Sequence, residues 1–239
     1  MKKQQKGMGS GVVFFLLMVF VVILIGCSGS SSGDSDESGN GTSSVVYVEN
    51  FGIQIPEWDP STDCAGDVAF DNSHKPFTFF GEAKNGSSQR TPELGFITKK
   101  NVYVTAITDC TVEAVEYQPE TVDYSVRMTC GSFDTDQDHI KNPTVKIGDA
   151  VNAKTVIGQV ADWWVNDKFG VTELQINVKD ENQIWKAHCI WDYFNPNTKS
   201  DNMARITQLM KDWEKFTKDT SQFDENNSYL PGCVVAVVD

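Results

Sequence analysis

Short segments in which hydrophobic or β-branched residues alternate with polar ones fill the chain between residues 96 and 178. They lie at 101–107, 111–116, 124–129, 155–160 and 173–178. Turn-forming pairs such as Gly148-Asp149 and Asn152-Ala153 separate them. A period of two over four to eight residues, interrupted by turn residues, is typical of β-strands. The pattern predicts a mainly β domain.

A different period appears between Asp201 and Lys218. The apolar residues there are three or four positions apart: Met203, Ile206, Leu209, Met210, Trp213 and Phe216. This spacing predicts one amphipathic helix, with Ser200 or Asp201 as its N-terminal cap. We expect its apolar stripe to pack on the β domain rather than to bind a partner.

The N-terminus has the pattern of an export signal. Lys2, Lys3 and Lys6 precede an uncharged apolar run at 12–25, which ends in Leu-Ile-Gly-Cys at 24–27. A run of about 14 residues is short for a membrane span, which needs roughly 20. The four-residue ending resembles the bacterial lipobox, which implies a signal peptide at 1–26 and a lipid on Cys27. The alternative is an uncleaved anchor helix that ends in a chance cysteine.

The residues after Cys27 predict a tether and a location. Twelve of the 17 residues from Ser28 to Ser44 are Ser or Gly, so this stretch cannot bury enough apolar area to fold. We therefore expect lipidated Cys27 and a flexible tether over 27–44, with the folded part beginning at Val45. Ser28 after the lipidated cysteine favours the outer membrane, facing the periplasm. The cell surface is the alternative location.

The charge of the chain argues against some partners. Its 239 residues include 20 Lys and Arg against 33 Asp and Glu, a formal net charge of −13. Loss of residues 1–26 would remove three lysines and bring the charge to −16. An acidic chain lacks the clustered cations that phosphate backbones require, so a nucleic-acid partner is not expected. It suits a protein partner better than an anionic glycan or lipid.

Five cysteines follow Cys27, at positions 64, 110, 130, 189 and 233. In an oxidising envelope we expect an even number of them to form disulfides. Cys110 and Cys130 are equally distant from a turn signal at Pro119-Glu120, and Cys189 and Cys233 flank the helical segment, which favours these two pairs and leaves Cys64 out. Zinc binding is the rival interpretation, but no Cys-x-x-Cys is present and His188 is directly next to Cys189.

The β region carries five segments in a recognisable order. They read VTAITDCTV at 104–112, His-Ile at 139–140, NPTVKIGDAVNAKTVIGQV at 142–160, ELQINV at 173–178 and CIWDYFNP at 189–196. Together they resemble the LytM/lysostaphin-type peptidoglycan metallopeptidases, whose domain is also called the duplicated hybrid motif. The resemblance covers about residues 77–196. It implies a barrel-sandwich hybrid β domain at 45–196 and a C-terminal helical extension at 197–239.

This sequence departs from that family at the metal ligands. The family holds zinc with His-x-x-x-Asp and the second His of His-x-His, and two further histidines act in catalysis. By the resemblance, Glu93 and Ile97 occupy the first motif, Glu173 and Gln175 occupy the pair, and only His139 is retained. A catalytic zinc needs three protein ligands, and two glutamates are too few oxygens for Ca²⁺. The sequence predicts no zinc, no other cofactor and no catalytic residues.

Two features remain as candidate binding residues. His139 is either a relic that hydrogen-bonds in a groove or an exposed loop residue beside a run of aspartates, and we favour the exposed loop. Trp163 and Trp164 precede the 173–178 strand, in a loop that borders the substrate groove of the resembled family. They would either bind a sugar or a partner, or fill the groove as core.

Three functions are compatible with these features. The chain could be a catalytically inactive LytM-like lipoprotein that binds a wall hydrolase or peptidoglycan, a wall metallohydrolase with altered ligands, or a structural module of an envelope complex. The missing ligands favour the first.

Lipidation is directly testable. Replacing Cys27 by Ser removes the only sulfur that a lipobox enzyme can modify, so the variant should accumulate as an unprocessed, mislocalised precursor without incorporated palmitate. Normal palmitate labelling of Cys27→Ser would refute the lipobox.

Overall fold

The structure, a computed structural model, describes residues 45–84, 88–225 and 230–234. These residues belong to one unit that begins at Ser43. The predicted signal peptide, Cys27 and the tether lie outside the described residues and stay predictions. Within the described part of the chain, no helix is both long enough and apolar enough to cross a membrane.

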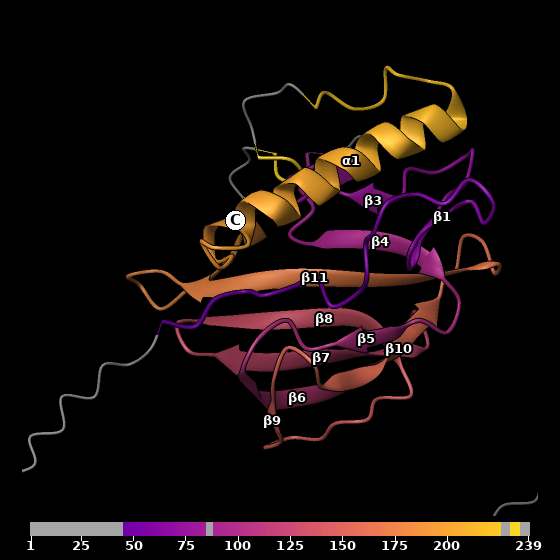
Figure 1. Ribbon diagram of the computed structural model, residues 1–239. Coiled ribbons are helices and arrows are strands. Elements are labelled where there is room, and N and C mark those ends of the chain that lie inside the picture. Colours follow the sequence, from indigo (N-terminus) through magenta and orange to yellow (C-terminus); the bar gives the residue numbers. More distant parts are fainter. Residues whose placement is uncertain (1–44, 85–87, 226–229, 235–239) are drawn as a thin grey trace, which may run out of the picture. The chain divides into compact units, whose positions relative to one another are not determined.

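A single curled sheet of twelve strands dominates the unit (Figure 1). Its main path runs β1-β2-β4-β11-β10-β8-β7-β6-β9, with β12 on β11, β3 on β4 and β5 on β10. The strands are β1 (Cys64–Ala65), β2 (Val68–Ala69), β3 (Phe77–Thr78), β4 (Leu94–Lys99), β5 (Tyr103–Thr105), β6 (Cys110–Gln118), β7 (Asp123–Cys130), β8 (Phe133–Lys141), β9 (Ala150–Val151), β10 (Val156–Asp162), β11 (Phe169–Lys179) and β12 (Trp185–His188).

The mainly β prediction is confirmed. Each of the five alternating segments coincides in most of its length or in part with a strand, namely β5, β6, β7, β10 and β11. The sequence pattern missed β8, although this strand pairs with β7, β10 and β11. Its outward positions are Asp134, Asp136 and Asp138, and aspartate is depleted in strands. Because of these aspartates, the sequence pattern did not indicate a strand at β8.

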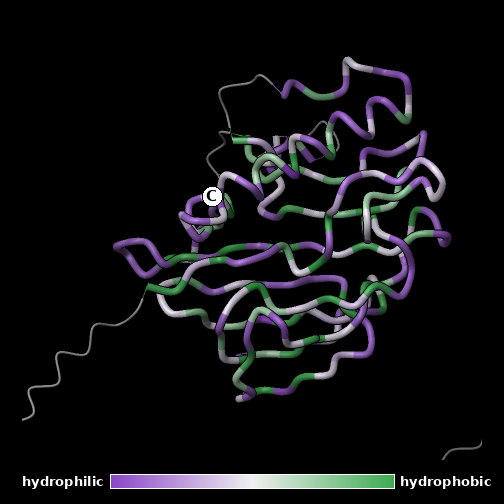
Figure 2. Tube along the Cα trace, in the orientation of Figure 1, coloured by the Kyte–Doolittle hydropathy of each residue, from purple (hydrophilic) through white to green (hydrophobic). Residues whose placement is uncertain are grey.

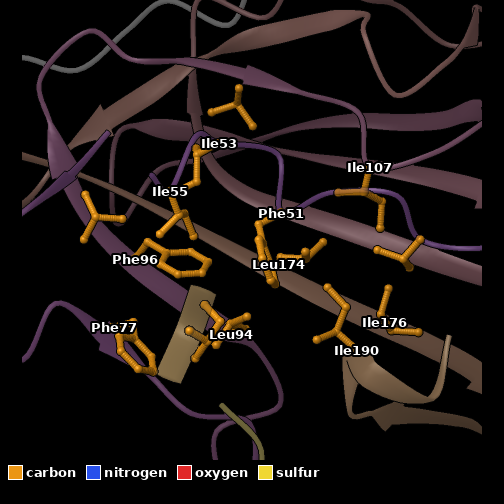
Figure 3. Packing of buried hydrophobic residues seen from close by; sticks show 14 of the residues in the cluster. Phe51, Ile53, Ile55, Phe77, Leu94, Phe96, Ile107, Leu174, Ile176 and Ile190 are labelled. Atoms are coloured by element: carbon orange, nitrogen blue, oxygen red, sulfur yellow. The ribbon is translucent and has the colours of Figure 1, made fainter. Parts of the chain in front are cut away.

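The core lies on the inner face of this sheet. The segment at 51–55 crosses it and contributes Phe51, Ile53 and Ile55, which meet Phe96 of β4 and Leu174 of β11 (Figure 3). Along β11, hydrophobic and hydrophilic residues alternate (Figure 2). The alternation buries one face of the strand and leaves the opposite face polar.

The C-terminal helix is also confirmed. It is α1 (Lys199–Thr217), which follows the 3₁₀ turn η2 (Ile190–Asp192) and lies beside β3 and β4 in Figure 1. Its stripe is docked on the domain, with these residues buried: Ile206, Leu209, Met210 and Trp213. The expected cap is wrong: Ser200 and Asp201 lie inside the helix, and the N-cap is Thr198, whose side chain makes no capping hydrogen bond.

Both expected disulfides are present. Cys110–Cys130 joins the ends of the β6–β7 hairpin, with the two Cα atoms 4.3 Å apart. Cys189–Cys233 fastens the segment that follows α1 to the residue before η2. Cys64 is free. The positions of the hairpin and the helix, as predicted from the sequence, therefore identified both cysteine pairs correctly.

Candidate functional site

A groove of about 770 Å³ opens at one end of β11. It is lined by Glu93 and Gly95 at the start of β4 and by Glu173 of β11. Residues of the segment at 73–84 and of the loop at 163–165 also line it. We call it the first groove. It contains three positions that the sequence singled out in separate motifs: Glu93, His139 and Glu173.

His139 is buried within β8, so the expected exposed loop position is wrong. Its backbone φ is +59°, and it lies between Asp138, which pairs with β11, and Ile140, which pairs with β10. Here β8 has one residue more than β7, as in a β-bulge. A bulge redirects a side chain. In this case, the imidazole lines the groove.

Two carboxylates hold the imidazole from opposite sides. Nδ1 lies 2.7 Å from Oδ2 of Asp123, whose side chain is fully buried. Nε2 lies 3.5 Å from Oε2 of Glu173. Asp123 is itself fixed, because the Thr121 hydroxyl donates to its Oδ1 over 2.6 Å. The ring is therefore fixed in one orientation by hydrogen bonds to both of its nitrogens.

Glu93 extends this arrangement. Glu173 pairs with Gly95 across the β4–β11 ladder, and a Cβ at Gly95 would lie 3.2 Å from Cγ of Glu173. The glycine thus leaves space for the Glu173 side chain, which hydrogen-bonds to buried Glu93. Four groups form what we call the carboxyl–histidine chain, in this order: Asp123, His139, Glu173 and Glu93.

The environment shifts two pKa values of this chain. Burial alone would lower the pKa of His139, but the hydrogen bonds and charges of Asp123 and Glu173 outweigh it and raise the pKa to about 10. Burial, with the adjacent Glu173 charge, raises the pKa of Glu93 to about 8. At neutral pH, His139 is therefore an imidazolium and Glu93 a neutral acid. Their N–H and O–H groups donate within the carboxyl–histidine chain.

The two neighbouring tryptophans have different environments. Trp163 is 9% exposed and packs with Ile97, Val171 and Phe169. Trp164 is 59% exposed, and its ring centroid lies 4.9 Å from that of His139. Trp163 therefore acts as core, while Trp164 offers an aromatic surface beside the carboxyl–histidine chain. The core interpretation from sequence is confirmed for Trp163, and the binding interpretation stays a prediction for Trp164.

The residues at the family's zinc positions do not fit a zinc ion. Ile97 belongs to the apolar cluster around Trp163. Gln175 does not line the first groove, and its Nε2 donates to Oδ1 of Asn177 over 2.6 Å. In the described ranges, no three His, Cys, Asp or Glu side chains are grouped to hold a metal. A borderline ion that prefers nitrogen and sulfur finds neither here in sufficient number.

Sequence reasoning missed two residues of this site. Asp123 was not distinguished from the other acidic residues, because its role depends on a hairpin that brings it opposite the β8 bulge. His74 was set aside as lying before the barrel, but it lines the groove, with Nδ1 2.6 Å from Oδ2 of Asp71. His188 is elsewhere, 3.1 Å from the Tyr193 hydroxyl.

No protein-family model and no curated protein matches the chain. Similar solved structures do exist. Lysostaphin of Staphylococcus simulans has 18% identity over 46% of this chain and 45% of that chain, with a TM-score of 0.39. LytU has 15% identity over 50% and 84%, with a TM-score of 0.42. The SpoIIQ–SpoIIIAH pore-forming complex has 15% identity over 66% and 98%, with a TM-score of 0.42.

This chain thus spans about half the length of lysostaphin. The resemblance predicted from the sequence is confirmed as a likeness of fold, that of LytM-like peptidase domains. At these identities and TM-scores, no activity and no residue role is transferred from those proteins. The function must therefore be inferred from the first groove itself.

The shifted pKa of Glu93 predicts a pH-dependent stability. The pKa of Glu93 is raised in the folded state. The protonated side chain therefore makes its full contribution to the free energy of unfolding below its ordinary pKa of 4.5, and this contribution is lost as the pH rises through about 8. Glu93→Gln keeps the side-chain size without the titration. Relative to this variant, the parent should lose up to about 1.4 kcal/mol of unfolding free energy per pH unit between pH of about 5 and 8.

Urea unfolding at several pH values measures this difference. Glu181→Gln is the matched control, since Glu181 is exposed beyond the end of β11; its curve should run parallel to that of the parent. A Glu93→Gln curve that also runs parallel to the parent would show that Glu93 is not the buried neutral acid described above.

Proposed function

We propose that this chain is an envelope lipoprotein whose β domain binds peptidoglycan in the first groove without cutting it. One observation carries the proposal: the groove is open, but the positions of the family's zinc ligands hold a buried acid (Glu93), an apolar residue (Ile97) and an amide that does not line the groove (Gln175). The groove therefore keeps surfaces that can bind a ligand, although it lacks the three metal ligands that a zinc hydrolase needs.

The groove has the features of a site for a peptide-linked sugar polymer. Glu173 supplies acceptor oxygens, and the imidazolium of His139 and the neutral acid of Glu93 hold it in place. Trp164 adds an exposed ring of the kind that packs on the C–H face of a sugar. Ligand sites commonly combine an aromatic surface with a few fixed polar groups.

The N-terminal features supply the location in this proposal. A lipid on Cys27 would anchor the chain at the outer membrane, facing the periplasm. The tether would have a root-mean-square reach of roughly 20–25 Å. That reach would let the domain contact the wall while it remains anchored. A cell-surface position is the alternative.

A wall hydrolase is the second candidate partner. It is favoured by the net charge, which would be −16 after signal-peptide cleavage and which opposes close approach to anionic polymers. Such a partner would contact the exposed rim of the groove, where Trp164 and Val165 are both more than half exposed. The two candidates give different outcomes in one experiment.

Sedimentation with purified sacculi tests the proposal. The protein is a chain that starts at Ser43, which retains every core residue named above. We expect it to co-sediment with sacculi, and Trp164→Ala should weaken the affinity by about tenfold, which corresponds to the loss of one stacked aromatic contact. Tyr103→Ala is the control, because Tyr103 is 62% exposed on β5 and does not line the groove.

Three results would count against peptidoglycan binding without cleavage. Absence of co-sedimentation, together with tight binding to a periplasmic wall hydrolase, would transfer the function to the second candidate. Equal binding by the parent and by Trp164→Ala would show that the first groove does not bind the sacculus. Release of soluble wall fragments that Glu173→Ala abolishes would show that the domain is a hydrolase.

A further inference from the structure

A second groove, of about 420 Å³, opens on the polar face of the sheet at the other end of β8 and β11. None of its residues belongs to the first groove. The residues that the inference uses come from β7, β8, β11 and β12: Arg127, Thr129, Asp134, Asp136, Asn177 and Trp185.

Hydrogen bonds hold the planar polar groups of the second groove in place. Asp136 accepts from Nε of Arg127 over 3.2 Å at one oxygen and from Nδ2 of Asn177 over 2.8 Å at the other. The carbonyl of Asn177 in turn accepts from Gln175, and Asp134 accepts from the Thr129 hydroxyl over 2.9 Å. A ligand therefore meets groups that are already ordered, which lowers the entropy cost of binding.

Trp185 supplies an aromatic surface at this groove. Its side chain is 48% exposed. The ammonium of Lys179 lies 4.7 Å from its ring centroid, a cation–π contact that fixes the ring on β12. An exposed tryptophan on a strand is not needed for folding, whereas a fixed ring beside ordered polar groups is suited to binding.

We infer that the second groove is a saccharide subsite that binds neutral, hydroxyl-rich sugars. The indole ring of Trp185 packs on the C–H face of a sugar ring. The carboxylates and the amide accept from or donate to its hydroxyls, and the guanidinium has further N–H donors besides the Nε–H that Asp136 uses.

The charge of the groove selects among sugars. Glu113, Asp134 and Asp136 contribute three carboxylates against the guanidinium of Arg127 and the ammonium of Lys179 at the Trp185 ring. This balance repels anionic ligands and leaves neutral sugars, such as N-acetylated amino sugars, as the favoured class. A cationic peptide is the competing class, and the experiment below separates the two.

The positions of the two grooves suggest joint use. Glu173 in the first and Asn177 in the second lie on the same face of β11, four residues apart. At about 3.3 Å per residue, their Cα atoms are roughly 13 Å apart. One wall fragment could then contact both grooves at once. Joint use rests on the proposed function, but the saccharide subsite itself does not.

Titration with a neutral N-acetylglucosamine trimer tests the subsite, using the chain from Ser43 and calorimetry. The parent should bind at millimolar or lower concentration. Trp185→Ala and Asn177→Ala should each weaken binding by about tenfold, as expected for loss of a stacking surface or an ordered hydrogen-bonding group. Tyr103→Ala and Tyr117→Ala are aromatic controls outside both grooves, since both side chains are more than half exposed, and they should bind as the parent does.

Near-ultraviolet circular dichroism of each variant checks that the fold is retained. We expect Trp185→Ala to fold, because it removes an exposed side chain. The inference is overturned if the parent binds no trimer, or if Trp164→Ala weakens binding and Trp185→Ala does not. It is also overturned if an oligolysine peptide binds in a Trp185-dependent manner while the sugar does not. The sacculus experiment tests the first groove through Trp164, and the titration tests the second groove through Trp185. A negative titration therefore does not change the interpretation of the sacculus experiment.

Discussion

The fixation of His139 between Asp123 and Glu173 is the interaction on which the first groove depends. It requires the β8 bulge, the pairing of β7 with β8 that brings Asp123 beside this bulge, and Gly95, which leaves space for Glu173. The two carboxylates raise the pKa of the imidazole, and burial, together with the Glu173 charge, raises the pKa of Glu93. One buried charge arrangement thus sets the acceptors and the shape of the groove, and it does so with hydrogen bonds where a zinc enzyme would use metal bonds.

Much of the fold could be predicted, because it depends on local signals. Period-two alternation located five strands, and a spacing of three and four located α1. The register of β11 was readable from Leu174 and Ile176, which must face the core, so Glu173 had to face the opposite side. The turn between Cys110 and Cys130 was enough to pair them. These inferences needed only neighbours in the chain.

The site was harder to predict, because it depends on long-range geometry. Alternating aspartates gave β8 the appearance of a polar loop, so His139 was expected to be exposed. Nothing local marks Asp123 as the partner of a residue 16 positions later. Trp163 and Trp164 are adjacent in sequence, and only the packing of Ile97 and Val171 decides which of them is buried. The second groove is assembled from five strands, and its residues form no sequence motif.

The central claim is that hydrogen bonds, and not a metal, organise the first groove. Elemental analysis of the chain purified without chelator tests it most directly. The account predicts far less than one zinc per chain, and no change in zinc content when His139 or Glu173 is replaced by Ala. About one zinc per chain that withstands mild chelation, as a three-ligand site would hold it, and that is lost in Glu173→Ala, would contradict the account.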